Sequence, residues 1–502
     1  MHELARRGPG SWLAPLRFPA GEWTDLAGKH PHGMTFPRLR RHILRAVGFA
    51  PLAGLLCGPS AALAATPASV RWVCTTEAQR WLEKTVERVA PGTPAPTDAL
   101  TLDPGKRIQT IEGFGGCFNE LGWEALTALP AEKRDAALRE LFAPDGANFT
   151  LGRAPIGAND FSLGWYSLDE TPGDYAMEHF SIARDRQDLI PFIKAAMKYQ
   201  PALGIWAVPW CPPSWMTTNG RYRQGRIKDD PQTLAAYAIY LSRFVQAWRA
   251  EGINLYAIHP QNEPTLNDNI YPQCLWTASQ MNVFLRDHLL PRLKRDRVAV
   301  EVWLGTIVNE SLSEYVDPVL GDPATGPSLV GVGYQYGGQK ALLATHQRYP
   351  GKRLAQTETE CYGGGNSWDQ AMLTFGHLIE DTANFASSYF FWNLVLDESG
   401  LSRWNWRQNS LLTVDRRTET VVYNPEFFSM KHFSAFVLPG AQRIAVNGGP
   451  CKRIVAFQNP DGSRILIVAN DTDREIPAVL DADGTAVRLA IPAQSMNTLV
   501  LR

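Results

Sequence analysis

The feature that most constrains this chain is an alternation of short apolar runs with longer amphipathic segments, which starts near residue 105. Most runs are continuously apolar, as expected of strands buried on both faces. Eight runs are found, at residues 108–116, 149–157, 203–210, 255–261, 298–305, 329–336, 353–360 and 387–396. The repeated strand–helix alternation predicts a (β/α)8 barrel, an α/β fold of the TIM-barrel type, over residues 105–432.

The segments between these runs have the spacing of amphipathic helices. They occupy residues 130–142, 181–199, 230–252, 277–296, 339–350 and 367–385. Two of them carry start signals. Ser181 opens the second segment as a cap, and Asp230 with Pro231 opens the third as a cap followed by a first-turn proline.

The strand–helix alternation ends at residue 432. Short β-type runs follow one another over residues 433–502, separated by turn signals at residues 459–462 and 482–484. Residues 68–104 also contain β-type runs, "SVRWVCTT" and "ALTLDP". We therefore predict a small antiparallel β-domain to which both stretches contribute.

The N-terminal part predicts export. Residues 34–64 join a basic start to an apolar stretch, and Ala62-Leu63-Ala64 resembles a signal-peptidase site, with cleavage near Ala64. The protein is then secreted or periplasmic, with no integral membrane segment after cleavage. Residues 1–33 are interpreted as a disordered lead or an over-extended gene start. Export permits disulfides, and the six cysteines that remain leave free thiols and one or two bridges both open.

Composition narrows the choice of partner. The net charge is −1, which argues against a nucleic-acid surface or an anionic membrane surface as the main partner. Sixteen tryptophans are many for 502 residues. They are either core aromatics or stacking platforms for a ring-shaped ligand such as a sugar.

Catalytic groups of such barrels lie at the carboxyl ends of the strands. Here these ends carry carboxylates, amides, one arginine and aromatics: Asn119, Glu120, Arg153, Asn159, Asp160, Trp210, Asn262, Glu263, Tyr334, Gln335, Tyr336, Glu358, Glu360, Trp392 and Asn393. The sequence has no Ser-His-Asp order, no glycine-rich phosphate loop and no metal-ligand cluster. No cofactor and no metal are expected.

Two carboxylates on different strands of one barrel indicate glycoside hydrolysis. One acid protonates the leaving oxygen while the other carboxylate attacks the sugar carbon, and a separation of about 5–5.5 Å gives the retaining outcome. Glu263 and Glu358 are the candidates. Asn262 could hold the sugar 2-hydroxyl. Trp210 and Trp392 could stack on sugar faces and raise the pKa of the acid by excluding water.

Eight motifs in order strengthen this interpretation: "IQTIEGFGGCFNE", "GRAPIGANDFS", "VPWCPPSWMTTNG", "QNEP", "YPQC", "QTETEC", "FFWNLVLDESG" and "MKHFSAFVLPGAQRI". Together they resemble glycoside hydrolase family 30, the glucosylceramidase-like retaining β-glycosidases. The resemblance implies a (β/α)8 barrel with a flanking antiparallel β-sandwich built from both chain ends. It implies Glu263 as acid/base, Glu358 as nucleophile, and sugar-binding or supporting roles for Glu120, Arg153, Trp210, Asn262, Gln273, Tyr336 and Trp392.

"QTETEC" departs from a simple motif because it offers two glutamates. A strand period of two places Glu358 and Glu360 on the same face, so periodicity does not choose between them. The family pattern favours Glu358. Asp160 is interpreted as a loop cap rather than a third acid, and His259 as a core histidine. Arg153 could pair with Glu120 or with Glu358.

Two further departures concern the sugar. Glucosylceramidases of the family have an aspartate where Glu120 stands, and His-Trp-Tyr where this chain has Tyr334-Gln335-Tyr336. Glucose, xylose, fucose, galactose and glucuronate all stay open as the glycone, as do linkage and oligomeric state.

The sequence thus predicts a secreted retaining β-glycosidase of the β-glucosidase or glucosylceramidase type, acting on a carbohydrate or glycolipid. Alternatives are the same fold acting as a β-1,6-glucanase, β-xylosidase or β-fucosidase, a transglycosylating enzyme, and a non-catalytic carbohydrate-binding protein.

Overall fold

The computed structural model describes residues 69–90, 96–266, 270–360, 362–482 and 484–502. The lead predicted at residues 1–33 and the signal peptide predicted at residues 34–64 lie outside these residues. Within the described ranges, no helix combines the length and the apolar character needed to cross a membrane.

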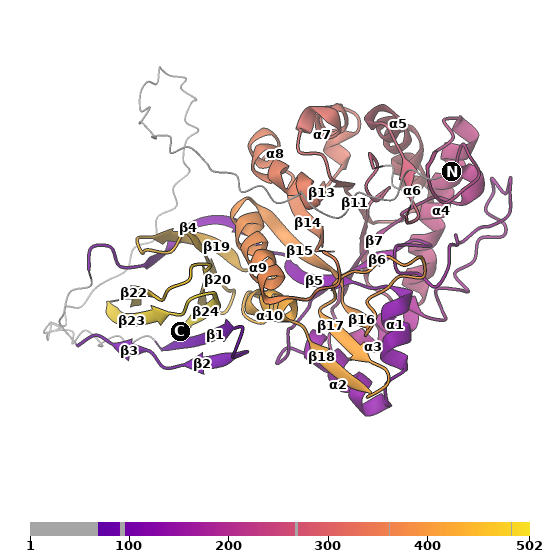
Figure 1. The fold of residues 1–502 in the computed structure, drawn as a ribbon. Coiled ribbons are helices and arrows are strands. Elements are labelled where there is room, and N and C mark those ends of the chain that lie inside the picture. Colours follow the sequence, from indigo (N-terminus) through magenta and orange to yellow (C-terminus); the bar gives the residue numbers. More distant parts are fainter. Residues whose placement is uncertain (1–68, 91–95, 267–269, 361, 483) are drawn as a thin grey trace, which may run out of the picture. The chain divides into compact units, whose positions relative to one another are not determined.

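A sheet of parallel strands forms the centre of the fold (Figure 1). In spatial order its strands are β11 (Glu301–Val302), β9 (Leu255–Ile258), β7 (Gly204–Val208), β6 (Leu151–Pro155), β5 (Gly113–Cys117), β15 (Ala386–Asn393), β14 (Arg353–Thr359), β13 (Gly331–Gln335) and β12 (Leu304–Ile307). The first and last of these are two halves of one apolar run, divided at Trp303. The sheet therefore returns to its own beginning, which confirms the predicted barrel, with the fifth strand in two pieces.

The described helices are α1 (Glu120–Thr127), α2 (Ala131–Phe142), α3 (Leu189–Met197), α4 (Pro231–Ala250), α5 (Ala278–Val283), α6 (Leu290–Asp296), α7 (Val316–Leu320), α8 (Leu342–Arg348), α9 (Trp368–Ala383) and α10 (Pro425–Ser434). Helix α4 begins as predicted, because the Asp230 side chain accepts a hydrogen bond from the Thr233 amide at 2.9 Å and Pro231 fills the first turn. A π-helical turn over Phe284–Leu289 joins α5 to α6.

The prediction that Ser181 starts a helix is wrong. Turns occupy residues 183–188, and α3 starts only at Leu189. Pro191 explains the difference. In α3 it lies in the first turn, where its missing N–H is not needed, whereas a helix starting after Ser181 would place it in the interior and lose a hydrogen bond.

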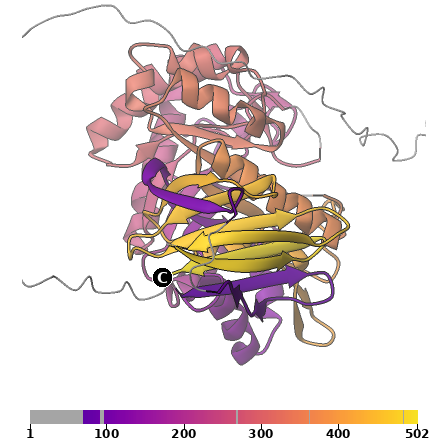
Figure 2. The same cartoon turned by 90° about the vertical axis from the view of Figure 1, so that its left-hand side faces the viewer.

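Beside the barrel lies a β-sandwich (Figure 2). Its larger sheet is antiparallel and has the order β2 (Leu82–Lys84), β1 (Val70–Thr76), β24 (Ser495–Leu501), β21 (Arg464–Asn470), β20 (Arg453–Gln458), β19 (Gln442–Asn447) and β4 (Thr101–Thr110). The smaller sheet has the order β22 (Ile476–Ala482), β23 (Thr485–Ile491) and β3 (Glu87–Arg88). Trp72 and Leu466 of one sheet share a core with Leu480 and Leu489 of the other. Strands within residues 70–110 and 442–501 thus build this domain together.

The run predicted as the first barrel strand, residues 108–116, belongs to two sheets. Strand β4 continues to Thr110 in the sandwich, and the barrel strand β5 starts at Gly113. The hydrogen-bond partner changes within one residue: the Ile111 amide bonds to Ala441, and the Glu112 amide bonds to Ser387 of the barrel. The chain therefore enters the barrel after residue 105, which periodicity alone did not indicate, since the same apolar run serves both sheets.

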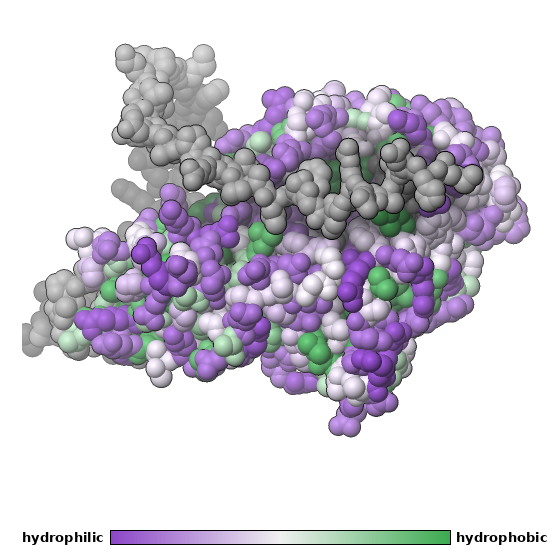
Figure 3. All heavy atoms as spheres, in the orientation of Figure 1, coloured by the Kyte–Doolittle hydropathy of each residue, from purple (hydrophilic) through white to green (hydrophobic). Residues whose placement is uncertain are grey.

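Two small sheets lie in the loops after the barrel strands. Strand β8 (Gly225–Arg226) pairs with β10 (Cys274–Leu275), and β16 (Val395–Asp397) and β18 (Thr420–Tyr423) flank β17 (Leu412–Asp415). The first sheet ties the loop after β7 to the loop after β9, and the second lies wholly within the segment that follows β15. On the face drawn in Figure 3, hydrophobic residues stand in small groups among hydrophilic ones.

Candidate active site

Glu263 follows β9, and its backbone is held in a conformation that is uncommon for a residue with a side chain. Its φ is +43°, in the left-handed region. The Asn262 amide donates to the Pro209 carbonyl at 2.8 Å, and the Glu263 amide donates to the Thr306 carbonyl at 3.1 Å. These bonds, to the loop after β7 and to strand β12, fix the turn. Strained residues of this kind cluster at functional sites.

The Glu263 carboxyl is buried among neutral donors. Gln335 Nε2 donates to its Oε1 at 2.7 Å, and the Tyr271 hydroxyl donates to its Oε2 at 2.7 Å. Burial, and secondarily the charge of Glu358, raise the pKa of Glu263 to about 7, although both hydrogen bonds act in the opposite direction. The group can therefore hold a proton near neutral pH.

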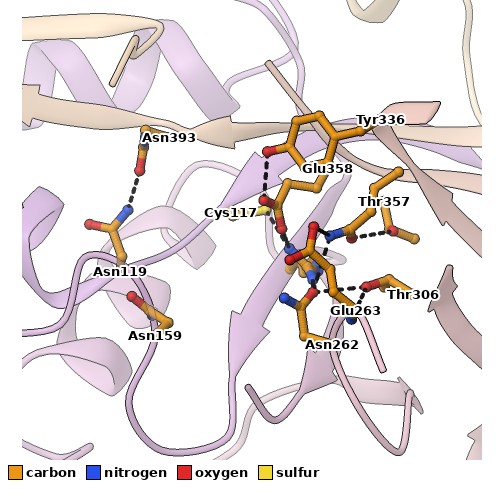
Figure 4. A network of polar contacts seen from close by, with 12 residues as sticks. Cys117, Asn119, Asn159, Asn262, Glu263, Thr306, Tyr336, Thr357, Glu358 and Asn393 are labelled. Carbon is orange, nitrogen blue, oxygen red and sulfur yellow. Dashed lines mark hydrogen bonds and ion pairs between the residues drawn. The ribbon is translucent and has the colours of Figure 1, made fainter. Parts of the chain in front are cut away.

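Glu358 lies in the same cluster with a different set of partners (Figure 4). Arg153 Nη1 donates to its Oε2 at 2.5 Å, and the Tyr336 hydroxyl donates to its Oε1 at 2.8 Å. The other nitrogen of the guanidinium, Nη2, donates to Asn262 Oδ1 at 2.6 Å. Arg153 thus joins Glu358 to the residue beside Glu263, through a charge-assisted hydrogen bond.

Asn262 is oriented by the same network. Its Oδ1 accepts from Arg153 and also from the Thr306 hydroxyl at 2.8 Å. Gln335 Nε2, which bonds to Glu263, reaches the same oxygen at 3.4 Å. Because donors hold Oδ1, the Asn262 amide nitrogen is directed elsewhere.

Glu360 is separated from Glu358, although a regular strand would place both on one face. Strand β14 ends at Thr359, and its register with β13 shifts between Tyr334 and Gln335. Glu360 Oε1 pairs with His377 Nδ1 of α9 at 2.7 Å. Arg153 and Tyr336 both donate to Glu358 and not to Glu360. Glu358 is also the glutamate that the family pattern favours.

Trp210 and Trp392 pack against each other and against Arg153. Their ring centroids are 5.3 Å apart, and the guanidinium carbon lies 4.6 Å from the Trp210 centroid and 5.7 Å from that of Trp392. Both side chains are buried. They surround the cation with a region of low polarity and add cation–π attraction. Sugar stacking on their faces stays a prediction.

Asp160 is a third buried carboxyl of this site. Its neighbour Asn159 forms the loop cap, since Asn159 Oδ1 accepts from the Phe161 amide at 2.6 Å. Burial, and then the charges of Glu358 and Glu263, raise the pKa of Asp160 well above its usual value. Asp160 Oδ1 has no hydrogen-bond partner among the described residues. The cap role that the sequence suggested for Asp160 is therefore wrong, because the adjacent asparagine performs it.

The hydrogen bonds of Glu120 go to residues other than Glu263 and Glu358. Arg184 donates to both of its oxygens, at 3.0 Å from Nε and 2.9 Å from Nη2, and the Leu163 amide donates to Oε2 at 2.6 Å. Glu120 thus braces the loop that carries Asp160. Arg153, which could have paired with Glu120, pairs with Glu358 instead.

Gln273 lies beside the acid but contacts it indirectly, since its Nε2 is 3.5 Å from the Tyr271 hydroxyl. Tyr271 and Gln335 bond to the acid, although the sequence marked Gln335 only as a strand-end amide and Tyr271 only as part of the motif "YPQC". The periodicity of a sequence does not show which residues will contact an acid. His259 is buried and its pKa is lowered to about 3, as expected of a neutral core histidine. In the part of the chain that the structure describes, no cluster of acids, histidines and cysteines could hold a metal.

A (β/α)8 barrel whose mouth holds two glutamates in one buried cluster, with amides and aromatics around them, is the architecture of a glycoside hydrolase. Comparison with family models agrees. The glycosyl hydrolase family 30 TIM-barrel domain matches residues 111–437, and the family 30 beta-sandwich domain matches residues 440–499. The chain belongs to glycosyl hydrolase family 30.

Relatives of two kinds are similar to it. Putative glucosylceramidase 1 of Caenorhabditis elegans is 31% identical, covering 74% of this chain and 76% of the relative. The lysosomal acid glucosylceramidase of Mus musculus is 28% identical, covering 80% and 83%. The endo-1,6-beta-D-glucanase of Neurospora crassa is 27% identical, covering 78% and 86%. A solved endo-beta1,6-glucanase is 26% identical, with a TM-score of 0.78, and covers 86% of this chain and 99% of its own.

Proposed function

We propose that this chain is a retaining β-glycosidase in which Glu358 is the nucleophile and Glu263 is first the acid and then the base. One observation carries the proposal: the two glutamates share a buried cluster, yet Glu358 is paired with a cation while Glu263 is surrounded by neutral donors. An acid and a nucleophile need that division.

The reaction follows from these partners. The Glu358 carboxylate attacks the anomeric carbon while the Glu263 carboxyl transfers its proton to the leaving oxygen, so that the glycosidic bond breaks and a glycosyl–Glu358 ester forms. Glu263, now ionised, then takes a proton from water, and the resulting hydroxide equivalent displaces Glu358 from the sugar. The product keeps the β configuration, and both glutamates return to their starting states.

Neighbouring side chains support the sugar in this scheme. Oδ1 of Asn262 is held by Arg153 and Thr306, which presents the amide nitrogen as a donor to the sugar 2-hydroxyl. Asp160 Oδ1 has no protein partner among the described residues and is suited to accept from a glycone hydroxyl. The Trp210 and Trp392 rings exclude water from the same cluster.

A β-glucoside is the substrate class that the relatives favour, since both kinds of relative are named for a glucosyl substrate and the endo-1,6-beta-D-glucanase for its β linkage. Export, which the pattern of residues 34–64 predicts, is part of the same proposal. It would place the enzyme where glycans or glycolipids outside the cytoplasm are accessible.

Trapping the intermediate tests the proposal. Incubation with 2-deoxy-2-fluoro-β-glucosyl fluoride should add one fluoroglucosyl group, and peptide mass spectrometry should place it on Glu358. Glu358→Gln should stay unlabelled, and Glu360→Gln should label like the original chain. A label on Glu360, or an α-configured first product in NMR spectra of substrate hydrolysis, would contradict the proposed mechanism.

A further inference from the structure

We propose that the leaving group of this enzyme is itself a sugar, bound by a rim of aromatic side chains on the Glu263 side of the site. The rim consists of Tyr271, Trp406, Trp404 and Trp165, which come from the loops that follow three different barrel strands. This inference rests on the proposed function, because the role of Glu263 sets the direction in which the leaving group lies.

The rim begins at the acid. Tyr271 donates its hydroxyl to Glu263 Oε2 at 2.7 Å. The Trp406 ring stacks on the Tyr271 ring, with centroids 5.2 Å apart and planes at 16°. Since the acid protonates the leaving oxygen, whatever that oxygen belongs to lies next to this acid. Trp406 is therefore on the aglycone side.

A tight turn presents two tryptophans in succession. The Ser402 amide bonds to the Trp406 carbonyl at 2.8 Å, and the Trp406 amide bonds to Ser402 Oγ at 3.0 Å. Asn405, between the two tryptophans, has φ of +62°, and its amide bonds to the Ser402 carbonyl at 3.1 Å. The turn is thus closed by backbone and side-chain bonds, and it offers Trp406 toward Tyr271 and Trp404 in another direction.

Trp404 meets a third tryptophan from the loop after β6. Its ring contacts Trp165 edge to face, with centroids 5.6 Å apart, and the Arg223 guanidinium lies 5.2 Å from the Trp165 centroid. Trp165 follows Asp160 by a few residues, so the loop that carries the third carboxyl also carries this part of the rim. The aromatic rim therefore extends from the loops after β9 and β15 to the loop after β6.

The chemistry of the rim fits a sugar. Its three tryptophans are only partly buried, so ring surface is left for a ligand. A sugar ring offers a face of C–H groups that packs flat on an aromatic ring, whereas an alkyl chain has no ring face to match it.

A lipid is the competing occupant. Leu266, Ile270 and Leu401 are exposed apolar side chains on loops near the mouth, and they would favour the tails of a glycolipid. Leu266 and Ile270 share the loop after β9, whereas Leu401 follows β15 and lies in a β-bridge with Arg407, a charged residue. Trp406, by contrast, stacks on Tyr271, which itself bonds to the acid, so the structure favours the sugar.

Comparing substrates with and without an aglycone tests this inference. β-Glucosyl fluoride releases only fluoride, whereas gentiotriose and the other β-linked glucose oligomers place a sugar on the leaving side. For Trp404→Ala and Trp406→Ala, the ratio of kcat/KM for gentiotriose to that for glucosyl fluoride should fall roughly tenfold, as expected when about 1.4 kcal/mol of stacking is lost. Trp404→Phe should lie between.

Trp81→Ala is the matched control, since Trp81 is a partly buried tryptophan that stacks on Phe436 with centroids 5.6 Å apart, next to the sandwich. It should leave the ratio unchanged, and thermal unfolding of each variant should show that it is folded. Binding of gentiotriose to Glu358→Gln, measured by calorimetry, should weaken when Trp404→Ala is added.

Several outcomes would overturn the inference. One is an equal loss of kcat/KM on both substrates in the tryptophan variants. Another is that the original chain cleaves glucosyl fluoride but no β-glucose oligomer. A loss confined to glucosylceramide in detergent micelles would assign the rim to a lipid instead. Failure of the original chain to hydrolyse glucosyl fluoride would count against the proposed function itself, which distinguishes the two failures.

Discussion

Glu263 and Glu358 occupy one buried cluster, but the groups around them differ in charge. Glu263 receives hydrogen bonds from a phenol and a primary amide, both neutral. Glu358 receives one from the Arg153 guanidinium and one from the Tyr336 phenol. The same residue type can thus serve two chemical roles, because its neighbours decide which protonation state is favoured.

The comparison extends to the means by which each carboxyl is positioned. Glu263 depends on a strained backbone, φ +43°, whose amide is bonded to Thr306 of the next strand. Glu358 lies within strand β14, where the register with β13 shifts, and its side chain is held by Arg153 and Tyr336. Changes at Arg153 should therefore affect Glu358 first, and changes at Tyr271 should affect Glu263.

The largest effect is expected from replacing Glu358, the glutamate that is paired with a cation. In Glu358→Gln, turnover should fall further than the ~10⁴-fold ceiling expected for loss of a general acid–base group, since the attacking oxygen is gone. Steady-state hydrolysis of a nitrophenyl glucoside measures this. Glu360→Gln is the control and should retain activity within a few-fold, because Glu360 pairs with His377. A greater loss in Glu360→Gln would reverse the assignment.

The next largest effect is expected from replacing Glu263, the glutamate that has neutral donors around it. Glu263→Gln should lose about 10²–10⁴-fold in kcat on an alkyl or sugar glucoside, where the leaving group needs a proton. On a dinitrophenyl glucoside the first step should be nearly normal, since that leaving group departs without assistance. A plot of kcat/KM against leaving-group pKa should be steeper for the variant. Equal losses on all leaving groups would exclude Glu263 as the acid.

Removing Arg153, which joins Glu358 to Asn262 beside Glu263, gives a third effect, on stability. Arg153→Met leaves the Glu358 charge buried without its partner, and the free energy of unfolding should fall by about 3–5 kcal/mol. Denaturant titration measures this loss. The double variant Arg153→Met with Glu358→Gln should recover part of it, because the uncompensated charge is absent. No recovery would mean that Arg153 stabilises the barrel through other contacts.

The smallest effect adjusts the acid alone. The Tyr271 hydroxyl stabilises the ionised form of Glu263 and so lowers its pKa, against the burial that raises that pKa to about 7. Tyr271→Phe keeps the ring on Trp406 but removes this bond, so the pKa of Glu263 should rise. Because the protonated acid is the active form, the alkaline limb of kcat/KM should move to higher pH. A shift to lower pH would contradict the hydrogen-bond assignment.

The fold was predictable from the sequence because burial on both faces leaves continuous apolar runs, and all eight appear as barrel strands. Errors occurred where one local signal had two meanings. The run at residues 108–116 serves two sheets, and Ser181 resembles a cap although Pro191 delays the helix. Pairing across space, rather than the local pattern, decides both cases.

The site was less predictable. Strand-end position and motif marked Glu263, Glu358, Arg153 and Asn262, which the structure brings together. The same criterion marked Glu120, which turns to Arg184, because position on a strand does not tell which way a side chain points in the following loop. Asp160 and Gln335 were also marked as strand-end residues, but their place beside the glutamates depends, like that of Tyr271, on loop conformation and a register shift that no sequence period contains.

The sandwich has a consequence for how the chain is made. Strand β1 lies between β2 and β24, so residues 70–76 find their hydrogen-bond partners in residues 495–501. During synthesis the ribosome must therefore complete the whole barrel before the earliest described strand can be paired on both edges. Folding N-terminal first, the usual order for domains, is not available to the sandwich, so the barrel is the part that can form on the emerging chain.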